Sequence, residues 1–401
     1  MSVTKVTNTG AVSHTDGAVA TPSITNTGDL NTGVYFPAAD TVGVVTGGTE
    51  RFRFGSNPIP GGSKNMIHNG AMMVNQRGST SISGGTTVQS LDRFALTFYD
   101  ASATDAAATI TRDSDSPDGF GQSMKIDCTT IATGGGDYNY VYQRIEAQNL
   151  QHLKYGSSDA LTCTFSFWFK STVTGIYSAY FYHIDATYTF VREFTVASSD
   201  TWEFFQVTLP GYTSTNFGND TGAGLEIGIT LAATHAQAAS NNTWQTGGDA
   251  GGSTNQVNGL SSTSNNIYTT GWQFEVGDVA TDFEHLDYAT ALNHCFRYFV
   301  HTGVGTMGAA LSTSQAFFGF QYPVQMRAAP TAALVDTTMY VLDSGGGGLV
   351  GAPNAIYGST LNKTGCYLAI NGWSGGNALT QHRPLVIYNY GTDPISFSAE
   401  L

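Results

Sequence analysis

Hydrophobic and polar residues alternate along much of the chain after residue 64. Between residues 160 and 170, every second position from Leu161 to Phe169 is hydrophobic, and most positions between them carry a hydroxyl group. Because the side chains of a strand point alternately to its two faces, this pattern predicts a strand with one buried face. Similar stretches predict two strands in 175–194, joined by a turn at 185–187, and further strands in 202–209 and 224–231.

These strands follow one another without an intervening helical pattern. The central region, residues 63–288, is therefore expected to fold as an antiparallel β-sandwich or barrel. A linking helix is predicted next, over residues 289–300, because hydrophobic residues recur there at helical spacing and Asp287 is placed to cap the first turn. The hydrophobic stripe consists of Tyr288, Ala291, Leu292, Cys295, Phe296 and Phe299.

The two ends of the chain also predict β-structure. Residues 1–62 contain short extended segments separated by turn signals such as Asn-Thr-Gly, and they have few apolar side chains. This N-terminal β-rich module is expected to need neighbours or partner chains, because it cannot bury a core alone. Residues 301–401 predict a C-terminal β-sandwich domain, with strands in 316–320, 338–342, 366–370 and 385–390 between glycine-rich turns.

Composition strengthens this all-β prediction and excludes several kinds of partner. Only 11% of the 401 residues are charged, and the net charge of −14 repels nucleic acid. No stretch approaches 18 apolar residues, and the N-terminus lacks the apolar segment of a secretory signal, so we expect a soluble protein without membrane insertion. The four cysteines lack the spacing of a zinc site or a disulfide framework: Cys128, Cys163, Cys295 and Cys366.

Several motifs then follow one another in a fixed order. They are NMIHNG (65–70), NQRG (75–78), LDRF (91–94), YQRIE (142–146), LTCTFSFWFK (161–170) and GWQFEVG (271–277). This set resembles the jelly-roll domain of bacteriophage tail-fibre proteins, whose fold is similar to carbohydrate-binding modules. The turn-rich segment 22–53 and the motif CFRY (295–298) resemble other parts of the same proteins.

The resemblance implies a jelly roll at 63–288 and a receptor-binding protein that attaches a phage to host surface glycans without cleaving them. It also implies a homotrimer in the virion tail, made in the host cytoplasm, whose N-terminal module contacts other tail or virion proteins. No cofactor and no metal is expected. The alternatives are a structural virion protein, such as a head fibre or tail adaptor, and a tailspike that degrades glycans.

Aromatic residues are the candidate ligand-binding residues. On one predicted strand, Tyr138, Tyr140, Tyr142 and Arg144 share a face. Sugars bind against flat aromatic rings while charged and amide groups reach their hydroxyls, so this face is a candidate glycan site. The alternative is that these tyrosines fill a β core. Further candidates are Tyr180, Tyr182, the loop residue Trp244, which is otherwise an interchain anchor or a buried plug, and Trp373 in the C-terminal loops.

Catalytic and metal sites are not predicted. The chain has no GxSxG, P-loop or HExxH motif. Residues 113–119 contain three aspartates, but Pro117 disrupts the register of a calcium loop, so a surface loop is expected. His294 and Cys295 point about 100° apart on a helix, which does not suit nucleophilic catalysis. A carboxylate pair for glycan cleavage needs a separation of about 5–10 Å, which no sequence specifies. The candidates for such a pair are Asp185, Glu193 and Glu203.

Overall fold

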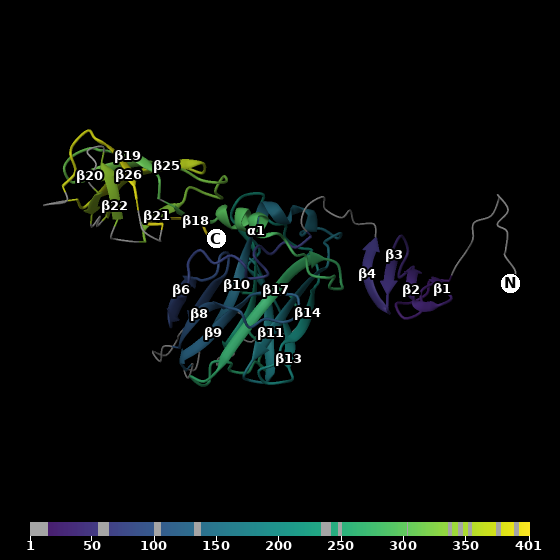
Figure 1. Ribbon diagram of the computed structural model, residues 1–401. Helices are drawn as coiled ribbons and strands as arrows, with labels where there is room; N and C mark the ends of the chain where they lie inside the picture. Colours follow the sequence, from purple (N-terminus) through teal and green to yellow (C-terminus); the bar gives the residue numbers. More distant parts are fainter. Residues whose placement is uncertain are drawn as a thin grey trace, which may run out of the picture. The chain divides into compact units, whose positions relative to one another are not determined.

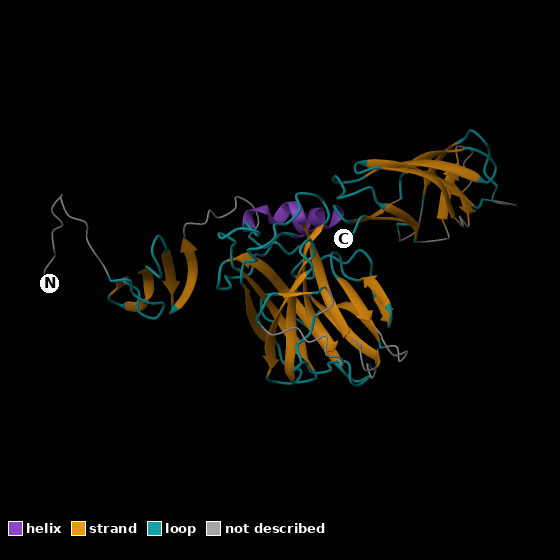
Figure 2. Cartoon of the chain, turned by 180° about the vertical axis from the view of Figure 1, so that it is seen from behind, coloured by secondary structure: helices purple, strands orange, loops and turns teal. Residues whose placement is uncertain are grey.

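The computed structural model describes most of the chain in twelve segments, which together form two compact units. The segments are residues 15–54, 64–99, 106–131, 138–233, 242–247, 251–302, 304–335, 339–343, 348–351, 355–373, 378–388 and 393–401. One unit comprises residues 1–64 with 279–284, and the other comprises 65–278 with 285–401. Strands dominate throughout (Figure 2), which confirms the predicted all-β class. Within the described segments, no helix is long and apolar enough to cross a bilayer.

The N-terminal unit contains a four-stranded antiparallel sheet. Its strands are β1 (Ile24–Asn26), β2 (Asp29–Tyr35), β3 (Val42–Thr46) and β4 (Thr49–Phe54), paired in chain order. Tyr35 and Val45 are the buried hydrophobic side chains among its described residues, and the Tyr35 hydroxyl donates to Glu50. So small a core agrees with the scarcity of apolar residues in this part of the sequence.

The central region is a two-sheet sandwich (Figure 1). The first sheet has the order β16 (Gln245–Thr246), β13 (Tyr188–Val196), β12 (Gly175–His183), β15 (Ala223–Ala233), β10 (Tyr138–Glu146), β7 (Ala95–Tyr99), β6 (Thr86–Gln89). The second has the order β14 (Glu203–Leu209), β11 (Cys163–Ser171), β17 (Asn266–Val276), β9 (Ser123–Thr130), β8 (Ala107–Asp113), β5 (Thr80–Ser83). Successive strands cross repeatedly between the sheets, as in a jelly roll.

Aromatic side chains fill the space between the two sheets. Phe165, Phe167 and Phe169 on β11 are fully buried, as the alternating pattern predicts. The ring of Phe165 packs edge-on against Phe181 of the facing sheet, with 6.0 Å between ring centroids. The period of two along the sequence therefore marks the inner face of the sandwich.

Helix α1 (Tyr288–Phe296) follows the sandwich, and Asp287 caps it as predicted, since its carboxylate accepts from the backbone N–H of Thr290 at 3.0 Å. The predicted extent of 289–300 was wrong at its end. Phe299 already belongs to strand β18 (Phe299–Thr302), whose pairing with β27 (Ile395–Ser398) replaces the helical hydrogen bonds. The 3₁₀ helix η1 (Ala147–Leu153) had no counterpart in the prediction.

The C-terminal region contains two further antiparallel sheets. The smaller has the order β18, β27, β21 (Thr331–Leu334). The larger has the order β23 (Gly348–Gly351), β22 (Met339–Asp343), β26 (Pro384–Ile387), β19 (Met307–Ala310), β20 (Gln315–Gln321), β25 (Gly365–Asn371), β24 (Ala355–Leu361). A second hydrophobic core, which includes Phe318, Leu368 and Trp373, stabilises them.

Candidate functional site

The predicted tyrosines lie on the outer side of the seven-stranded sandwich sheet. On β10, Val141 and Ile145 point into the core, so the alternate residues point outward. The pairing of β10 with β7 and β15, and of β15 with β12, brings side chains of four strands together on this side. We call it the tyrosine face; it comprises Tyr99, Tyr138, Tyr140, Tyr142, Arg144, Tyr180 and Tyr182.

Three rings form a column near one end of this face. Tyr99 stacks on Tyr138 with 4.7 Å between ring centroids and 20° between planes, and Tyr138 stacks on Tyr140 at 5.6 Å and 7°. Tyr99 keeps 47% of its surface exposed, and Tyr138 and Tyr140 are half-buried. Tyr99 was not among the predicted site residues, although alternation places it on the same face as Thr97. The pairing Tyr138↔Tyr99 brings it into the column.

Arg144 and Tyr180 are fixed by one carboxylate. Arg144 Nε donates to Glu226 Oε2 at 2.7 Å, and the hydroxyl of Tyr180 donates to Oε1 at 2.8 Å. The ring of Tyr180 lies over Gly228, where any side chain would overlap it. Burial raises the pKa of Tyr180 well above its usual value, so its phenol stays a neutral donor. Glu226 therefore holds a charged and an aromatic side chain in one orientation.

A loop covers part of the face. Thr230 Oγ1 donates to the carbonyl of Gly251 at 2.5 Å, and the backbone N–H of Ser253 donates to Ser178 Oγ at 3.0 Å. Tyr142 and Tyr180 keep only 4% and 2% of their surface exposed, so the prediction that they contact ligand was wrong. Their rings pack against neighbouring side chains of the sheet, which leaves almost no ring surface for a ligand. The rings still open to a ligand belong to Tyr99, Tyr138, Tyr140 and Tyr182.

The two predicted tryptophans have packing roles. Trp244 lies against Tyr212 and Phe190 at ring distances of 5.2 and 5.5 Å, and its Nε1 donates to the carbonyl of Pro210, so it is a plug at the sandwich edge. Trp373 is fully buried in the C-terminal core. As a ligand residue Trp373 was therefore a wrong prediction, since a ring without exposed surface cannot stack on a sugar. Its glycine-rich surroundings in the sequence did not reveal this burial.

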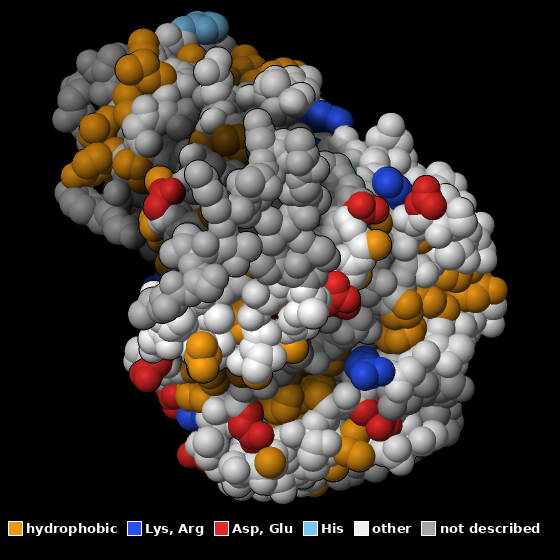
Figure 3. Space-filling model, turned by 90° about the vertical axis from the view of Figure 1, so that its right-hand side faces the viewer, with side chains coloured by type: hydrophobic (Ala, Val, Ile, Leu, Met, Phe, Trp, Pro, Cys, Tyr) orange, Lys and Arg blue, Asp and Glu red, His pale blue; other side chains and the backbone are white. Residues whose placement is uncertain are grey.

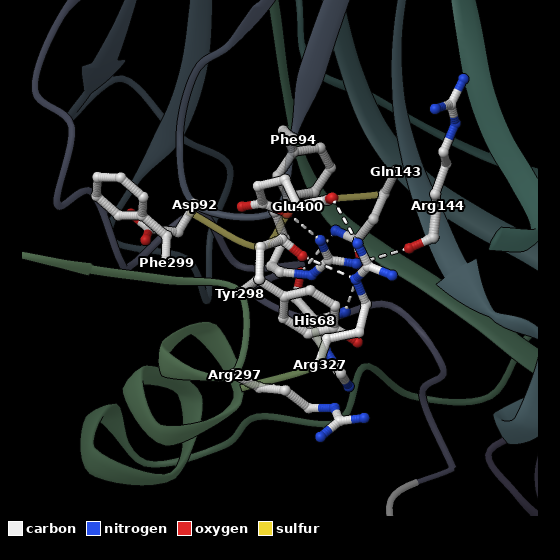
Figure 4. Close-up of polar contacts among 12 residues, drawn as sticks. His68, Asp92, Phe94, Gln143, Arg144, Arg297, Tyr298, Phe299, Arg327 and Glu400 are labelled. Atoms are coloured by element: carbon white, nitrogen blue, oxygen red, sulfur yellow. Dashed lines mark hydrogen bonds and ion pairs between the residues drawn. The ribbon is translucent and has the colours of Figure 1, made fainter. Parts of the chain in front are cut away.

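Residues of the motifs NQRG, LDRF, YQRIE and CFRY meet in a buried polar cluster at the end of the sandwich (Figure 4). Glu146 accepts hydrogen bonds from Arg297 Nε and Nη2 at 2.6 and 2.7 Å, from the Tyr298 hydroxyl at 2.6 Å and from Gln148 Nε2 at 2.8 Å. Burial alone raises the pKa of Glu146, but these hydrogen bonds outweigh it and hold the pKa below its usual value. Glu146 thereby joins β10 to the end of helix α1.

A second carboxylate in the same cluster joins the sandwich to the end of the described chain. Glu400 pairs with Arg77 at 3.0 Å and with Arg93, and Arg327 donates to the Glu400 carbonyl at 2.9 Å. Arg93 also donates to the carbonyl of Arg144 at 2.6 Å, while the Arg144 side chain points away from the cluster (Figure 4). Arg77 and Arg93 thus connect the sandwich to Glu400, and Arg297 connects helix α1 to Glu146.

The acidic residues considered for catalysis or calcium have other partners. Asp115 accepts from Lys170 Nζ at 2.5 Å and from Trp202 Nε1 at 2.9 Å. The three carboxylates considered for glycan cleavage each accept a separate hydrogen bond: Asp185 from Gly218 N, Glu193 from Asn255 Nδ2, and Glu203 from Ala197 N. Burial raises the pKa of the Cys295 thiol, which opposes a nucleophilic role. No group of three metal-ligating side chains occurs among the described residues.

A shallow pocket lies at the edge of the tyrosine face. It has room for about one water molecule. A sugar ring is too large to enter this pocket. The lining residues are Gln89, Arg93, Ala95, Tyr142, Arg144, Glu400 and Leu401.

Comparison with known proteins gives matches to solved structures alone. No family model matches the chain, and no curated protein matches it. One matching structure is the enzymatically active domain of tailspike protein 4 of bacteriophage CBA120, with 15% identity over 53% of this chain and 22% of that chain, and a TM-score of 0.30. The family 11 carbohydrate-binding module from Clostridium thermocellum, in complex with a mixed-linked tetrasaccharide, matches at 11% identity over 52% of this chain and 98% of its own, with a TM-score of 0.24. A CBM4 structure matches at 14% identity over 53% of this chain and 99% of its own, with a TM-score of 0.28. The β-sandwich assignment itself rests on the strand order described above.

Proposed function

We propose that this protein binds a glycan on the tyrosine face without cleaving it. The observation that carries the proposal is the column of Tyr99, Tyr138 and Tyr140, whose rings stack on one another and remain partly exposed on the outer side of a rigid sheet. Aromatic rings at a surface offer apolar area to the C–H faces of sugars, and neighbouring hydroxyls offer hydrogen bonds. Thr87 and Thr97, whose hydroxyls pair at 2.8 Å beside the column, are such neighbours.

Binding without cleavage fits the partners of the acidic residues. A glycosidase needs two carboxylates that converge on one bond, whereas Asp185, Glu193 and Glu203 each accept a hydrogen bond from a different group. An open surface beside a pocket of this size also suits a chain that lies across the sheet.

The proposed biological role rests on the resemblance of the sequence motifs to tail-fibre proteins. We propose a tail-fibre or receptor-binding protein of a phage virion, present as a homotrimer, with the N-terminal module toward other virion proteins and the tyrosine face toward the host. A single shallow site binds sugar weakly, but linked copies raise the effective concentration at a surface, so attachment becomes firm. The proposal therefore requires self-association as well as a sugar site.

Substitution of the exposed rings tests the glycan site. Tyr99→Ala and Tyr138→Ala are expected to weaken binding of purified protein to host cells or to arrayed glycans by about tenfold, or about 1.4 kcal/mol per site. Phe204→Ala is the matched control, because Phe204 is 48% exposed on the other sheet of the sandwich. Normal binding by both tyrosine variants, or equal loss in the control, would refute this site. Release of reducing ends from host polysaccharide would refute binding without cleavage.

A further inference from the structure

Two arginines with unused hydrogen-bond donors line the shallow pocket at the edge of the tyrosine face. Arg144 uses Nε to bind Glu226, but neither Nη1 nor Nη2 of its guanidinium forms a hydrogen bond with any described residue. Arg93 uses both terminal nitrogens, on Glu400 and on the carbonyl of Arg144, while its Nε is buried and has no acceptor among the described residues. Because an N–H group without an acceptor is costly away from water, this pocket favours a ligand that accepts hydrogen bonds.

The Arg144 guanidinium is held in one orientation and still reaches solvent. Glu226 accepts from Arg144 with one carboxylate oxygen and from Tyr180 with the other, and it is itself buried. The Arg144 side chain keeps 33% of its surface exposed, and Figure 4 shows it directed away from the buried cluster. A ligand that binds Arg144 therefore meets an ordered side chain, so binding loses little side-chain entropy.

The acidic side chains beside this pocket already have partners. Both carboxylate oxygens of Glu226 accept hydrogen bonds, and Glu400 accepts from Arg77 with one oxygen and from Arg93 with the other. The charged side chains that line the pocket are therefore two guanidinium groups and one carboxylate that is fully engaged. The complement of such a site is a group that only accepts hydrogen bonds, and carboxylates and phosphates are groups of this kind.

The size of the pocket favours the same kind of group. It has room for about one water molecule, so one oxygen atom of a carboxylate or phosphate fits in it while the sugar ring stays on the sheet surface. A sugar hydroxyl has a similar size. Hydrogen bonds between a guanidinium and an anion are, however, roughly twice as strong as those between neutral groups. The pocket therefore discriminates in favour of an anionic substituent.

The negative net charge of the protein does not prevent such binding. Charges farther away than about 8 Å are largely screened at physiological ionic strength, so the groups next to the pocket dominate. Lys and Arg make up only 16 of the 401 residues, and on the side of the molecule drawn in Figure 3 they lie singly and well apart. Arg93 and Arg144, which are hydrogen-bonded to each other, therefore form a local concentration of positive charge in an acidic protein.

We propose that the glycan bound on the tyrosine face carries an anionic group, a carboxylate or a phosphate, and that Arg144 binds this group through Nη1 and Nη2. This inference rests on the proposed function, because it names the class of glycan that the same face binds. Arg144 lies four residues beyond Tyr140 on β10, about 13 Å away along the strand. A ligand that contacts both side chains is therefore an oligosaccharide. The exposed rings supply binding area, and Arg144 supplies the selection for charge.

Matched pairs of acidic and neutral oligosaccharides on an array test this proposal with the full chain. The panel holds oligogalacturonate and oligomannuronate, each beside its carboxyl-reduced form, and phosphorylated oligomannose beside its dephosphorylated form. Wild-type protein is expected to bind the acidic member of at least one pair about tenfold more tightly than the neutral member. The carboxylate pairs and the phosphate pair distinguish the two anions. Arg144→Gln should abolish the preference, because it removes the charged fork that the anion contacts.

Controls separate the loss of the contact from misfolding. Arg112→Gln removes the same charge from an exposed position on β8 of the other sheet, so it should leave the preference unchanged. Circular dichroism and the melting temperature report on folding. If Arg144→Gln fails to fold because Glu226 loses its partner, Arg144→Lys replaces it. This variant keeps a cation beside Glu226 but cannot offer two parallel N–H groups, so it should still reduce the preference.

Three results would overturn the proposal. They are equal binding to both members of every bound pair, a preference that persists in a folded Arg144 variant, and the absence of binding to any acidic member. None of them decides the proposed function, which has its own test on host cells. If Tyr99→Ala and Tyr138→Ala still weaken binding there, the tyrosine face binds a neutral glycan and only the role of Arg144 is refuted.

Discussion

Glu146 provides the strongest test of the buried cluster. Its side chain is fully buried and receives two hydrogen bonds from Arg297 and one from Tyr298. Glu146→Gln keeps the shape but removes the negative charge and turns one acceptor into a donor that faces the guanidinium. Removing one partner of a buried ion pair costs about 3–5 kcal/mol. Because Arg297 keeps 27% of its side chain exposed and can regain water, we expect the lower end, about 3 kcal/mol.

Calorimetry of the full chain measures this effect. For a domain of this size, 1 kcal/mol shifts the melting temperature by about 2–4 °C, so the transition that includes the sandwich should fall by about 6–12 °C. Asp159→Asn is the matched control, because Asp159 is exposed and its substitution should change stability by less than about 0.5 kcal/mol. A Glu146→Gln protein that melts within about 1 °C of wild type would show that the cluster does not hold the helix to the sandwich.

The same pair predicts an acid dependence. The folded-state pKa of Glu146 lies below its usual value, so its contribution to stability is complete above the unfolded-state pKa. It is lost as the pH falls through the folded-state pKa. The difference in melting temperature between wild type and Glu146→Gln should therefore be largest near neutral pH and should shrink toward pH values below about 4. A difference that stays constant with pH would contradict a charged Glu146.

Three further outcomes follow from the packing. Gly228→Ala should destabilise the protein by about 1–3 kcal/mol in thermal melts, because the new methyl group displaces the ring of Tyr180, whereas Gly319→Ala, with open space around it, should change little. The melting temperature should fall as the pH drops below about 6.5, because burial holds the pKa of His68 well below its usual value and protonation therefore favours the unfolded chain. His68→Asn should reduce this fall. A pH dependence that is unchanged in this variant would refute the role of His68. Asp115→Asn should cost no more than about 1 kcal/mol, because its ion pair is partly exposed, and a larger loss measured by calorimetry would point to a further role.

Features set by local periodicity were predictable from the sequence. The inner face of β11 and the shared face of Tyr138, Tyr140 and Tyr142 both follow from alternation, which any strand imposes on its side chains. The cap at Asp287 follows from its side-chain chemistry and its place before a hydrophobic stripe. Each of these depends on residues a few positions apart, so no knowledge of distant contacts was needed.

Burial of single aromatic residues was not predictable, because it depends on distant segments. Tyr180 is covered since Gly228 of a neighbouring strand leaves space beneath its ring and the loop at Gly251 closes over it. Trp373 lies in a core that forms only when seven strands pair. Tyr99 joined the candidate site through its pairing with Tyr138, which a strand pattern does not specify. The end of helix α1 likewise depended on pairing with β27, nearly a hundred residues later in the chain.

The motif residues of the buried cluster differ from the exposed rings of the candidate ligand site, although Tyr142 and Arg144 of the tyrosine face belong to the motif YQRIE. Arg77, Arg93, Glu146 and Arg297 belong to four of the motifs that carry the resemblance, and all of them lie in the buried cluster that joins the sandwich to helix α1 and to Glu400. This cluster determines how the sandwich, helix α1 and Glu400 pack together, and it does not restrict which residues occupy the outer sheet surface. A chain with this cluster intact could therefore bind different ligands on that surface. In the proposed function, the glycan is therefore recognised by exposed residues of the outer sheet surface, with Tyr99 first among them. If Glu146→Gln lowered stability while glycan binding by the folded protein stayed intact, and Tyr99→Ala did the reverse, this separation of architecture from recognition would be established.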